Sequence, residues 1–490
     1  MLLSSIRQHI LDRAIRGQLV PQLPEEGTAE ELFQQIQAEK KALIANGSIK
    51  KEKPLEPIQE EEIKFDVPTS WKWVKLSEIA IVKGGKRIPA GKKLTPKNTG
   101  HIYIRISDME AGSVNMDNLL YVPTDIYPSI SRYIIKKEDV YITVAGTVGR
   151  VGKVPAELDG ANLTENADRL VLFKCNQDWL IFFLQTTFLQ GQILDSTKRV
   201  SQPKLALKRI ETLHIPLPPL NEQERIVRKI EALFSALDSL ESSQKRLSAI
   251  QTELTKRILD QAIQGKLVPQ LPEEGTAEEL FQQIQTEKQR LIAAGTIKKE
   301  KPLPSIEEKD LPFDIPETWK WVRWGEIVNV VSARRVHQSD WKMSGVPFYR
   351  AREIAALAEK DSIQNELYIS DELYHKLSES GIPRQGDVMV TAVGTLGKAY
   401  IVKDRDRFYY KDASVICLEN IGQIEPKYIK YALDSEMMKA QIKANSSGTT
   451  VGTLTIVRMN AYLIPLPPLA EQKRIVAKIE EMLTICKTLQ

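Results

Sequence analysis

The 490-residue chain has few of the side chains from which disulfide and metal sites are built. It contains three cysteines, Cys175, Cys417 and Cys486, and none of them belongs to a Cys-x-x-Cys pair. This argues against a disulfide framework and against a structural zinc site, and it fits a reducing cytosol. The five histidines are too scattered along the chain for a metal cluster. We therefore expect a cytoplasmic protein without a metal site.

Long apolar runs are missing as well. No stretch approaches the roughly 18 apolar residues of a membrane span, and the N-terminus lacks the apolar run of a signal peptide. A content of 42% hydrophobic and 27% charged residues is ordinary for a soluble protein. A chain of this length is expected to hold two to four domains.

Motifs of nucleotide and cofactor chemistry are also lacking. A P-loop needs Gly-x-x-x-x-Gly-Lys-Ser/Thr, but around Lys398 the first glycine is replaced by Ala392 and the hydroxyl residue by Ala399. No Asn-Pro-Pro-aromatic or Asp-Pro-Pro-aromatic methyltransferase motif is present. The glycines of residues 146–149 and 394–397 are better explained by tight turns between strands. We expect neither catalysis nor a bound cofactor in this chain.

What the chain does contain is an internal repeat. Residues 19–33 recur without a change at residues 267–281, an offset of 248. Shorter matches at a similar offset join residues 71–74 to 319–322 and residues 215–220 to 464–469. A period near 250 is far too long for a solenoid, so it indicates a tandem duplication of a whole unit.

The ends of the chain add a circular permutation to this duplication. Met1 aligns with Ala249 and Gln490 aligns with Glu241, so that only Ser242 to Ser248 have no counterpart. The repeat therefore predicts a pseudo-two-fold molecule whose two ends lie close together.

A long helix forms the centre of the repeat. Apolar residues recur with a mean period near 3.5 through residues 226–258, which is a heptad seam. The pattern predicts one helix from Asn221, as its N-cap, to about Gly265, roughly 65 Å at about 1.5 Å per residue. Such a helix cannot bury its apolar stripe alone. Its expected antiparallel partner is a split helix, residues 470–490 followed by residues 1–17, in which Ala470 replaces the capping asparagine.

Between the helices, each copy contains a Pro-bounded segment with one amphipathic helix, Ala29 to Ile44 in the first copy, and then a globular part. The globular parts are rich in strands at first and more helical toward their ends, so we expect α/β (α+β) modules. They match each other only at scattered positions, whereas the flanking segments are nearly identical. The expected domains are residues 1–64, 65–215, 216–312, 313–464 and 465–490.

Charge distinguishes the two globular parts. Residues 65–215 hold 21 Lys and Arg against 15 Asp and Glu, whereas residues 313–464 hold 20 against 19. In the first part, basic residues crowd a stretch rich in glycine and proline, which suits contact with phosphate groups and entry into a groove of DNA. The alternative reading of this stretch is a solvated basic loop.

The motif of residues 217–227, Leu-Pro-Pro-Leu-Asn-Glu-Gln-Glu-Arg-Ile-Val, followed by a long heptad helix, resembles the type I restriction-modification specificity subunit. The duplicated, circularly permuted layout resembles that family too. The resemblance implies two target-recognition domains that each read one half of a split DNA sequence, separated by an antiparallel helical spacer. The length of the long helix predicts a separation of about 60 Å between the modules. The resemblance also implies that the spacer docks two methyltransferase subunits and that motor-nuclease subunits join for cleavage. S-adenosylmethionine, ATP and magnesium are then expected in those partners.

Candidate site residues follow from the distribution of basic residues and from the family resemblance. Arginine can read guanine with two hydrogen bonds in the major groove, and lysine mostly neutralises phosphate. The residues expected to contact DNA are Lys86, Arg87, Lys92, Lys93, Arg105, Arg334, Arg335, Arg350 and Arg352. The resemblance places partner binding at the two helix starts, on Asn221, Glu222, Gln223, Arg225, Glu471, Gln472 and Arg474.

Two other functions stay open. A coiled-coil scaffold with two different protein-binding heads would show no salt-dependent affinity for DNA. A single-chain methyltransferase would need a cofactor motif, and binding of S-adenosylmethionine by the isolated chain would favour it.

Overall fold

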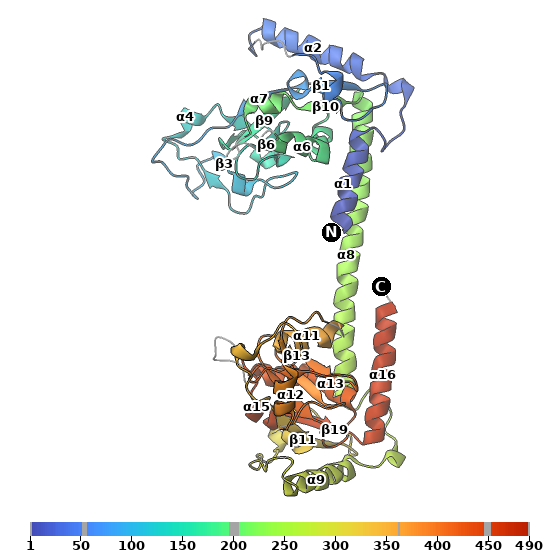
Figure 1. The fold of residues 1–490 in the computed structure, drawn as a ribbon. Helices are drawn as coiled ribbons and strands as arrows, with labels where there is room; N and C mark the ends of the chain where they lie inside the picture. The colour runs from blue at the N-terminus through green and yellow to red at the C-terminus, as the bar shows by residue number, and fades with distance from the viewer. Residues whose placement is uncertain are drawn as a thin grey trace. The chain divides into compact units, whose positions relative to one another are not determined.

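The structure, a computed structural model, describes residues 2–50, 56–195, 205–360, 363–379, 381–444 and 452–488. The chain divides into two compact units, Met1–Ser243 and Gln244–Gln490 (Figure 1). Corresponding elements follow one another in nearly the same order in both units. The α/β class and the duplication are thereby confirmed.

Each unit contains a pair of antiparallel helices. The long helix α8 (Leu220–Ile263) contributes its first part to the first unit, where α1 (Leu2–Ile15) runs beside it in the opposite direction (Figure 1). The guanidinium of Arg7 contacts Asp238 and lies 5.1 Å from the ring centroid of Phe234. In the second unit, α16 (Leu469–Thr488) runs against the later part of α8, and the amide of Gln251 donates to the Cys486 carbonyl at 2.9 Å.

The predicted start of the long helix is wrong by one residue. Since α8 begins at Leu220, Asn221 lies in its first turn instead of capping it. The amphipathic helix expected at Ala29 to Ile44 is observed as α2 (Ala29–Ala45). The expected proximity of Met1 and Gln490 concerns residues outside the described part of the chain.

The first module is built on an antiparallel four-stranded sheet with the strand order β2-β9-β6-β7. Val140, Tyr141, Ile142 and Thr143 are all buried because this sheet is covered on both faces. The strands are β2 (Ala80–Gly84), β6 (Val140–Thr143), β7 (Val151–Lys153) and β9 (Ala167–Leu172).

A second, smaller sheet completes this module. Its strand order is β4-β3-β8-β5, and its central pair, β3 and β8, is parallel. The strands are β3 (Ile102–Ile104), β4 (Leu120–Tyr121), β5 (Ile134–Ile135) and β8 (Ala161–Leu163), with helix α4 (Tyr127–Ile130) nearby in sequence.

The second module repeats the strand order of the larger sheet and the parallel pair of the smaller one. Its larger sheet has the order β12-β18-β15-β16, and its smaller sheet, β14-β13-β17, again contains one parallel pair, β13 and β17. The strands are β12 (Asn329–Val331), β13 (Val346–Tyr349), β14 (Tyr368–Ile369), β15 (Val388–Thr391), β16 (Ala399–Ile401), β17 (Tyr409–Tyr410) and β18 (Val415–Glu419). Helices α11 (Ala351–Lys360) and α12 (Asp371–Ser378) follow β13 and β14.

Short elements join each module to its helices. A two-stranded antiparallel ribbon, β1 with β10 and β11 with β19, leads into α8 and α16. In the first unit these elements are β1 (Lys72–Lys75), α3 (Leu76–Ile79), α5 (Gln177–Leu184), α6 (Thr187–Asp195), α7 (Leu207–Glu211) and β10 (His214–Leu217). In the second unit they are β11 (Lys320–Arg323), α10 (Trp324–Ile327), α13 (Pro426–Asp434), α14 (Glu436–Ala444), α15 (Ile456–Ala461) and β19 (Leu463–Leu466).

The amphipathic helix of each copy, α2 (Ala29–Ala45) or α9 (Ala277–Ala293), closes one end of its unit. Its apolar face joins the same core as the larger sheet, with Leu32 and Ile36 buried in the first unit. Each helix begins with a capping box, at Thr28 or Thr276. The sequence leaves the role of these segments open, and the structure shows that they cover the core.

The glycine that follows each antiparallel helix permits a close approach of the chain. Gly17 has a φ of +68°, and a Cβ there would lie 2.4 Å from Cγ of Pro68. Gly265 repeats this geometry, with a φ of +69° and Pro316 at 2.4 Å. Any other residue would combine a left-handed backbone with a clash, so both positions require glycine.

The glycine-rich loops lie where strands turn. Residues 146–149 connect β6 to β7, and residues 394–397 connect β15 to β16, each between paired antiparallel strands. The hydroxyls of Thr143 and Thr391 accept the backbone N–H of Arg150 and Lys398 at 2.9 and 3.0 Å. The prediction of a tight turn instead of a phosphate loop is confirmed.

Candidate nucleic-acid interface and helical frame

The basic stretch of the first module begins where β2 ends. Gly85 donates its N–H to the Ala167 carbonyl at 3.1 Å, and a Cβ on it would lie 2.0 Å from the carbonyl oxygen of Thr164. Lys86 donates its N–H to the Leu163 carbonyl at 2.8 Å. The first residues of the stretch are therefore held tightly against the end of the smaller sheet.

Two anchored side chains fix the direction of Arg87. Its side chain is 74% exposed, and its guanidinium forms an ion pair with Glu165 at 2.6 Å. The hydroxyl of Tyr103 donates to the Lys86 carbonyl at 2.9 Å and to Glu165 at 3.4 Å. Burial raises the pKa of Tyr103 to about 12, so this hydroxyl stays protonated and able to donate. Arg87 is thus exposed but directed by a partly buried acid.

The other basic residues of the stretch lie on the surface. Lys86 is exposed, and its ammonium lies 5.7 Å from the ring centroid of Tyr133. Lys92 is exposed and pairs with Asp125 at 2.8 Å, and Lys93 is exposed as well. These positions are accessible to a phosphate backbone, as the prediction needs.

Arg105 has a different environment from Arg87. It follows β3, and its guanidinium binds the buried carboxylate of Asp108 with two hydrogen bonds, of 2.9 and 2.5 Å. The backbone N–H of Arg105 also donates to Asp108, at 2.8 Å. A third guanidinium bond reaches the Asn118 carbonyl at 2.8 Å. These contacts direct Arg105 toward the protein, and its side chain is only 32% exposed.

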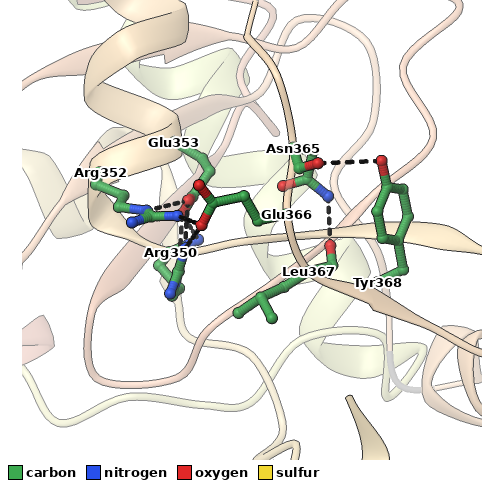
Figure 2. A network of polar contacts seen from close by, with 7 residues as sticks. All are labelled: Arg350, Arg352, Glu353, Asn365, Glu366, Leu367 and Tyr368. Carbon is green, nitrogen blue, oxygen red and sulfur yellow. Dashed lines mark hydrogen bonds and ion pairs between the residues drawn. The ribbon is translucent and has the colours of Figure 1, made fainter. Parts of the chain in front are cut away.

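The second module repeats this pair at the equivalent strand end (Figure 2). Arg350 follows β13 and binds Glu353 through guanidinium bonds of 2.7 and 3.1 Å, and its N–H donates to the same carboxylate at 2.9 Å. Burial alone raises the pKa of Glu353, but hydrogen bonds from Arg350 and Arg352 outweigh burial and lower it. Glu353 is therefore ionised and holds two arginines.

Arg352 extends this network outward. Its guanidinium is 57% exposed and contacts both Glu353 and Glu366, which converge on it in Figure 2. The hydroxyl of Tyr368 donates to the Asn365 carbonyl at 3.2 Å and so helps to place the segment that carries Glu366. The first module has Ser107 where the second has Arg352, so this outer arginine belongs to the second module alone.

Arg334 and Arg335 follow β12 as Lys86 and Arg87 follow β2. Both are exposed, and the backbone N–H of Arg334 donates to the hydroxyl of Tyr409 at 2.9 Å. Of the nine basic residues predicted to contact DNA, Arg105 and Arg350 follow strands of the smaller sheets and are held by buried carboxylates. These acids were not among the predicted site residues, although the spacing of an acid three residues after an arginine at a strand end could have indicated them.

At the start of each long helix, a second set of contacts is repeated bond for bond. The buried Glu222 carboxylate accepts the indole N–H of Trp71 at 3.0 Å and the amide of Gln22 at 2.8 Å. In the second unit, Glu471 accepts from Trp319 at 2.8 Å and from Gln270 at 2.7 Å. Trp71 and Trp319 are buried in the core, so their rings are not available to stack on bases.

A glutamine follows each of these acids and connects three segments. Gln223 is fully buried; its amide donates to the Pro218 carbonyl and its oxygen accepts the Asn176 N–H, at 3.0 and 2.9 Å. Gln472 makes the same bonds to the Pro467 carbonyl and the Glu425 N–H, at 2.9 and 3.0 Å. The bonds tie the proline-rich turn and the start of α5 or α13 to the long helix.

Arg225 completes this joint. It binds Glu26 with two hydrogen bonds, of 2.7 and 2.6 Å, and the Pro21 carbonyl at 3.0 Å. Arg474 binds Glu274 at the same two distances and the Pro269 carbonyl at 3.0 Å.

Of the residues predicted to bind partners, four are buried in this joint and act inside the chain, which limits them to an indirect part in docking. These four are Glu222, Gln223, Glu471 and Gln472. Asn221 is exposed, and Arg225 and Arg474 are partly exposed, so their predicted contacts with a partner stay predictions.

Within the described part of the chain, no helix is long and apolar enough to cross a membrane. No group of three His, Cys, Asp or Glu side chains is placed to hold a metal ion there.

Comparison with known proteins agrees with this geometry. The family model for the type I restriction modification DNA specificity domain matches residues 68–251 and 316–489. The sequence is 28% identical to the type I restriction enzyme EcoAI specificity subunit and 26% identical to the EcoEI specificity subunit, both of Escherichia coli. Each alignment covers 100% of this chain and 90% of the relative.

A chain from the solved structures on complex assembly and conformational transition of the type I R-M system shares the fold. It superposes with a TM-score of 0.57 at 20% sequence identity, over 87% of this chain and 93% of that chain.

One repeated frame that carries two diverged α/β modules places the chain among duplicated recognition subunits. The chain belongs to the type I restriction modification DNA specificity family. It is the specificity subunit of a type I restriction-modification system, with two target-recognition domains, as the resemblance in its sequence indicates.

Proposed function

We propose that this specificity subunit reads a two-part DNA target, one half with each module, and that it performs no chemistry itself. The observation that carries the proposal is the contrast between frame and modules. The frame repeats individual hydrogen bonds, such as those of Glu222 and Glu471, whereas the modules share a topology and differ in their surfaces. Two equal frames suit two copies of one partner, and two unequal modules suit two different half-sites.

The exposed basic residues of the two modules are the proposed DNA contacts. Arg87 and Arg352 are exposed and directed by acids, so they suit hydrogen bonding to base edges. Lys86, Lys92 and Lys93 suit phosphate contact. Arg105 and Arg350 are proposed to support the loops around them, because buried carboxylates already hold their guanidinium groups.

The proposed partners follow from the names of the relatives, which are specificity subunits of restriction enzymes. Two methyltransferase subunits would dock on the two helical frames, with Asn221, Arg225 and Arg474 near the contact. Motor-nuclease subunits would join for cleavage. S-adenosylmethionine, ATP and magnesium would then bind in those subunits, and the complex would act on DNA in the cytoplasm.

The spacing between the half-sites is proposed to depend on α8. This helix has 44 residues, so its length is about 66 Å at a rise of about 1.5 Å per residue. Residues 65–215 and 313–464 would be the two target-recognition domains, and the segments between them would form the spacer.

DNA affinity measured against salt concentration tests this proposal. For the complex with its methyltransferase subunits, log Kd plotted against log salt concentration should be steep, with a slope of about 0.9 per phosphate contact. Arg87→Ala and Arg335→Ala should each weaken binding to the cognate target. Arg290→Ala is the matched control, since Arg290 is also exposed and ion-paired but lies on α9. No salt dependence, or equal loss in the control, would favour the scaffold function.

A further inference from the structure

The second unit contains an open cavity that the activity described above does not use. Its volume is about 450 Å³, within the range of about 300–1,000 Å³ that is typical of ligand pockets. Ile263 at the end of α8, Phe313 and Met437 on α14 supply its apolar surface, and Asp260, Asp310 and Glu436 line it as well.

The first unit shows what fills the corresponding position there. Gln192 exchanges two hydrogen bonds with the backbone of His214, and Gln441 exchanges the same two with Leu463. This register makes Phe188 the counterpart of Met437.

Aromatic rings occupy the place in the first unit. The ring of Phe188 contacts the rings of Phe65 and Trp73, with centroid distances of 5.0 and 5.8 Å. The guanidinium of Arg16 lies 4.4 Å from the centroid of Phe65. The second unit keeps Phe313 and Trp321, at 5.1 Å, but has Met437 and Gln264 in place of the phenylalanine and the arginine.

The charge around the cavity favours a cation. The ionisable side chains among its lining residues, Asp260, Asp310 and Glu436, are all acidic. The carboxylate of Glu436 also forms an ion pair with the ammonium of Lys439, at 2.9 Å. Burial, and then the charge of Glu436, raise the pKa of Asp260, so a positive group placed beside both carboxylates would relieve their repulsion.

The shape of the site favours a polypeptide over a small molecule. A neighbouring cavity of about 380 Å³ shares Asp310, Gln441 and Leu463 with the first one, so the two adjoin and form one groove. Arg323 and Arg458 line the second cavity, so the acidic part of the groove is the first cavity alone. An extended chain can place one side chain in the apolar part of the groove and continue along the rest.

We propose that this groove binds a segment of a partner protein that carries an aromatic side chain next to a lysine or arginine. The aromatic ring takes the place that Phe188 fills in the first unit. The cation takes the place of Arg16, over the ring of Phe313 and beside Asp260. The first unit supplies these groups from its own chain, so the partner segment distinguishes the second unit from the first. This inference goes beyond DNA recognition and does not depend on it.

Binding of the peptide acetyl-Lys-(4-fluoro-Phe)-Lys-amide to the full chain, followed by fluorine NMR, tests the proposal. The wild-type chain should bind one peptide. The variant Met437→Phe/Gln264→Arg, which copies the first unit, should bind the peptide at least about tenfold more weakly. The reverse change, Phe188→Met/Arg16→Gln, should create a second binding site in the first unit.

Two further measurements keep the result interpretable if the first variant folds poorly. Asp260→Asn preserves volume and should weaken the lysine peptide but not acetyl-Gly-(4-fluoro-Phe)-Gly-amide. The acidic peptide acetyl-Glu-(4-fluoro-Phe)-Glu-amide should not bind the wild type. The proposal is overturned if the lysine peptide does not bind the wild type, or if it binds the filled variant and Asp260→Asn equally well.

Discussion

At the scale of single residues, the most consequential groups are buried acids. Glu222 and Glu471 start the two helices, and Asp108 and Glu353 support arginines in the modules. A buried carboxylate is costly unless hydrogen bonds compensate for lost hydration, and each of these four receives such bonds.

Burial raises the pKa of Glu222, despite hydrogen bonds from Trp71 and Gln22 that lower it. The folded state therefore holds this proton to higher pH than the unfolded state, and stability falls as the pH rises above the ordinary value of 4.5. Glu222→Gln cannot titrate and keeps an acceptor for the indole N–H. The melting temperature of this variant minus that of the wild type should increase from pH 4.5 to pH 7. Parallel curves for the two proteins would show that Glu222 does not titrate as described.

The opposite sign holds for Glu353. Burial alone raises its pKa, but its arginine partners lower it overall, so its stabilising effect is present above the unfolded pKa and lost in acid. Glu353→Gln should lower the free energy of unfolding at neutral pH by about 1–3 kcal/mol, because Arg350 loses its charged partner. Urea denaturation would measure this loss. Glu287→Gln breaks an ion pair on the surface and should leave the free energy of unfolding nearly unchanged, because solvent screens such pairs. An equal loss in both variants would contradict the account.

These acids explain what could be predicted of the site and what could not. Exposed basic positions such as Lys92 and Arg335 follow directly from composition and loop chemistry. The partners of Arg87 and Arg105 could not be predicted equally well, because Glu165 lies 78 residues from Arg87 and only the folded sheet brings the two together. Asp108 is only three residues from Arg105, and that local spacing could have been recognised.

At the scale of elements, the joint between module and long helix carries the duplication. Arg225 and Arg474 make the same three hydrogen bonds, so their removal should have the same effect. Arg225→Ala and Arg474→Ala should each cost about 1–3 kcal/mol in their own unit, as measured by hydrogen exchange of the adjoining helix. Lysine at either position should restore little of the lost stability, because it cannot make the bidentate interaction with Glu26 or Glu274. A loss in only one unit would show that the joints are not equivalent.

The continuity of α8 is a second property of this scale. Ser243 is exposed within the helix, in the stretch that has no counterpart in the repeat. Ser243→Pro should cost about 3 kcal/mol locally and open the helix to proteolysis near this residue. Binding to the full target should weaken while both units stay folded, and Ser243→Ala should change neither property. Unchanged binding by the proline variant would argue against a spacer role for α8.

Elements differ in how well the sequence predicts them. The heptad pattern located α8 within two residues at each end, because about nine turns of periodic residues, 226–258, give a strong signal. The two-residue strands β4, β5, β14 and β17 have no periodicity to detect. Their pairing comes from contacts between segments distant in sequence, such as β13 with β17.

At the scale of the whole molecule, the chain uses one plan twice and varies only the part that meets the target. The repeat in the sequence was sufficient to predict the two units, since identical segments fold alike. The common strand order of the two larger sheets was not visible there, because the sequences of the modules have diverged while that order has not.

The central claim is that each module reads its own half of one target. Long-read sequencing of modified bases, in cells that carry this gene with its methyltransferase partner, tests it most directly. The account predicts modified bases within a two-part motif separated by a fixed number of unspecified positions, and Arg87→Ala should change or relax only one half while Arg335→Ala affects only the other. A continuous motif, or one variant that alters both halves, would contradict it.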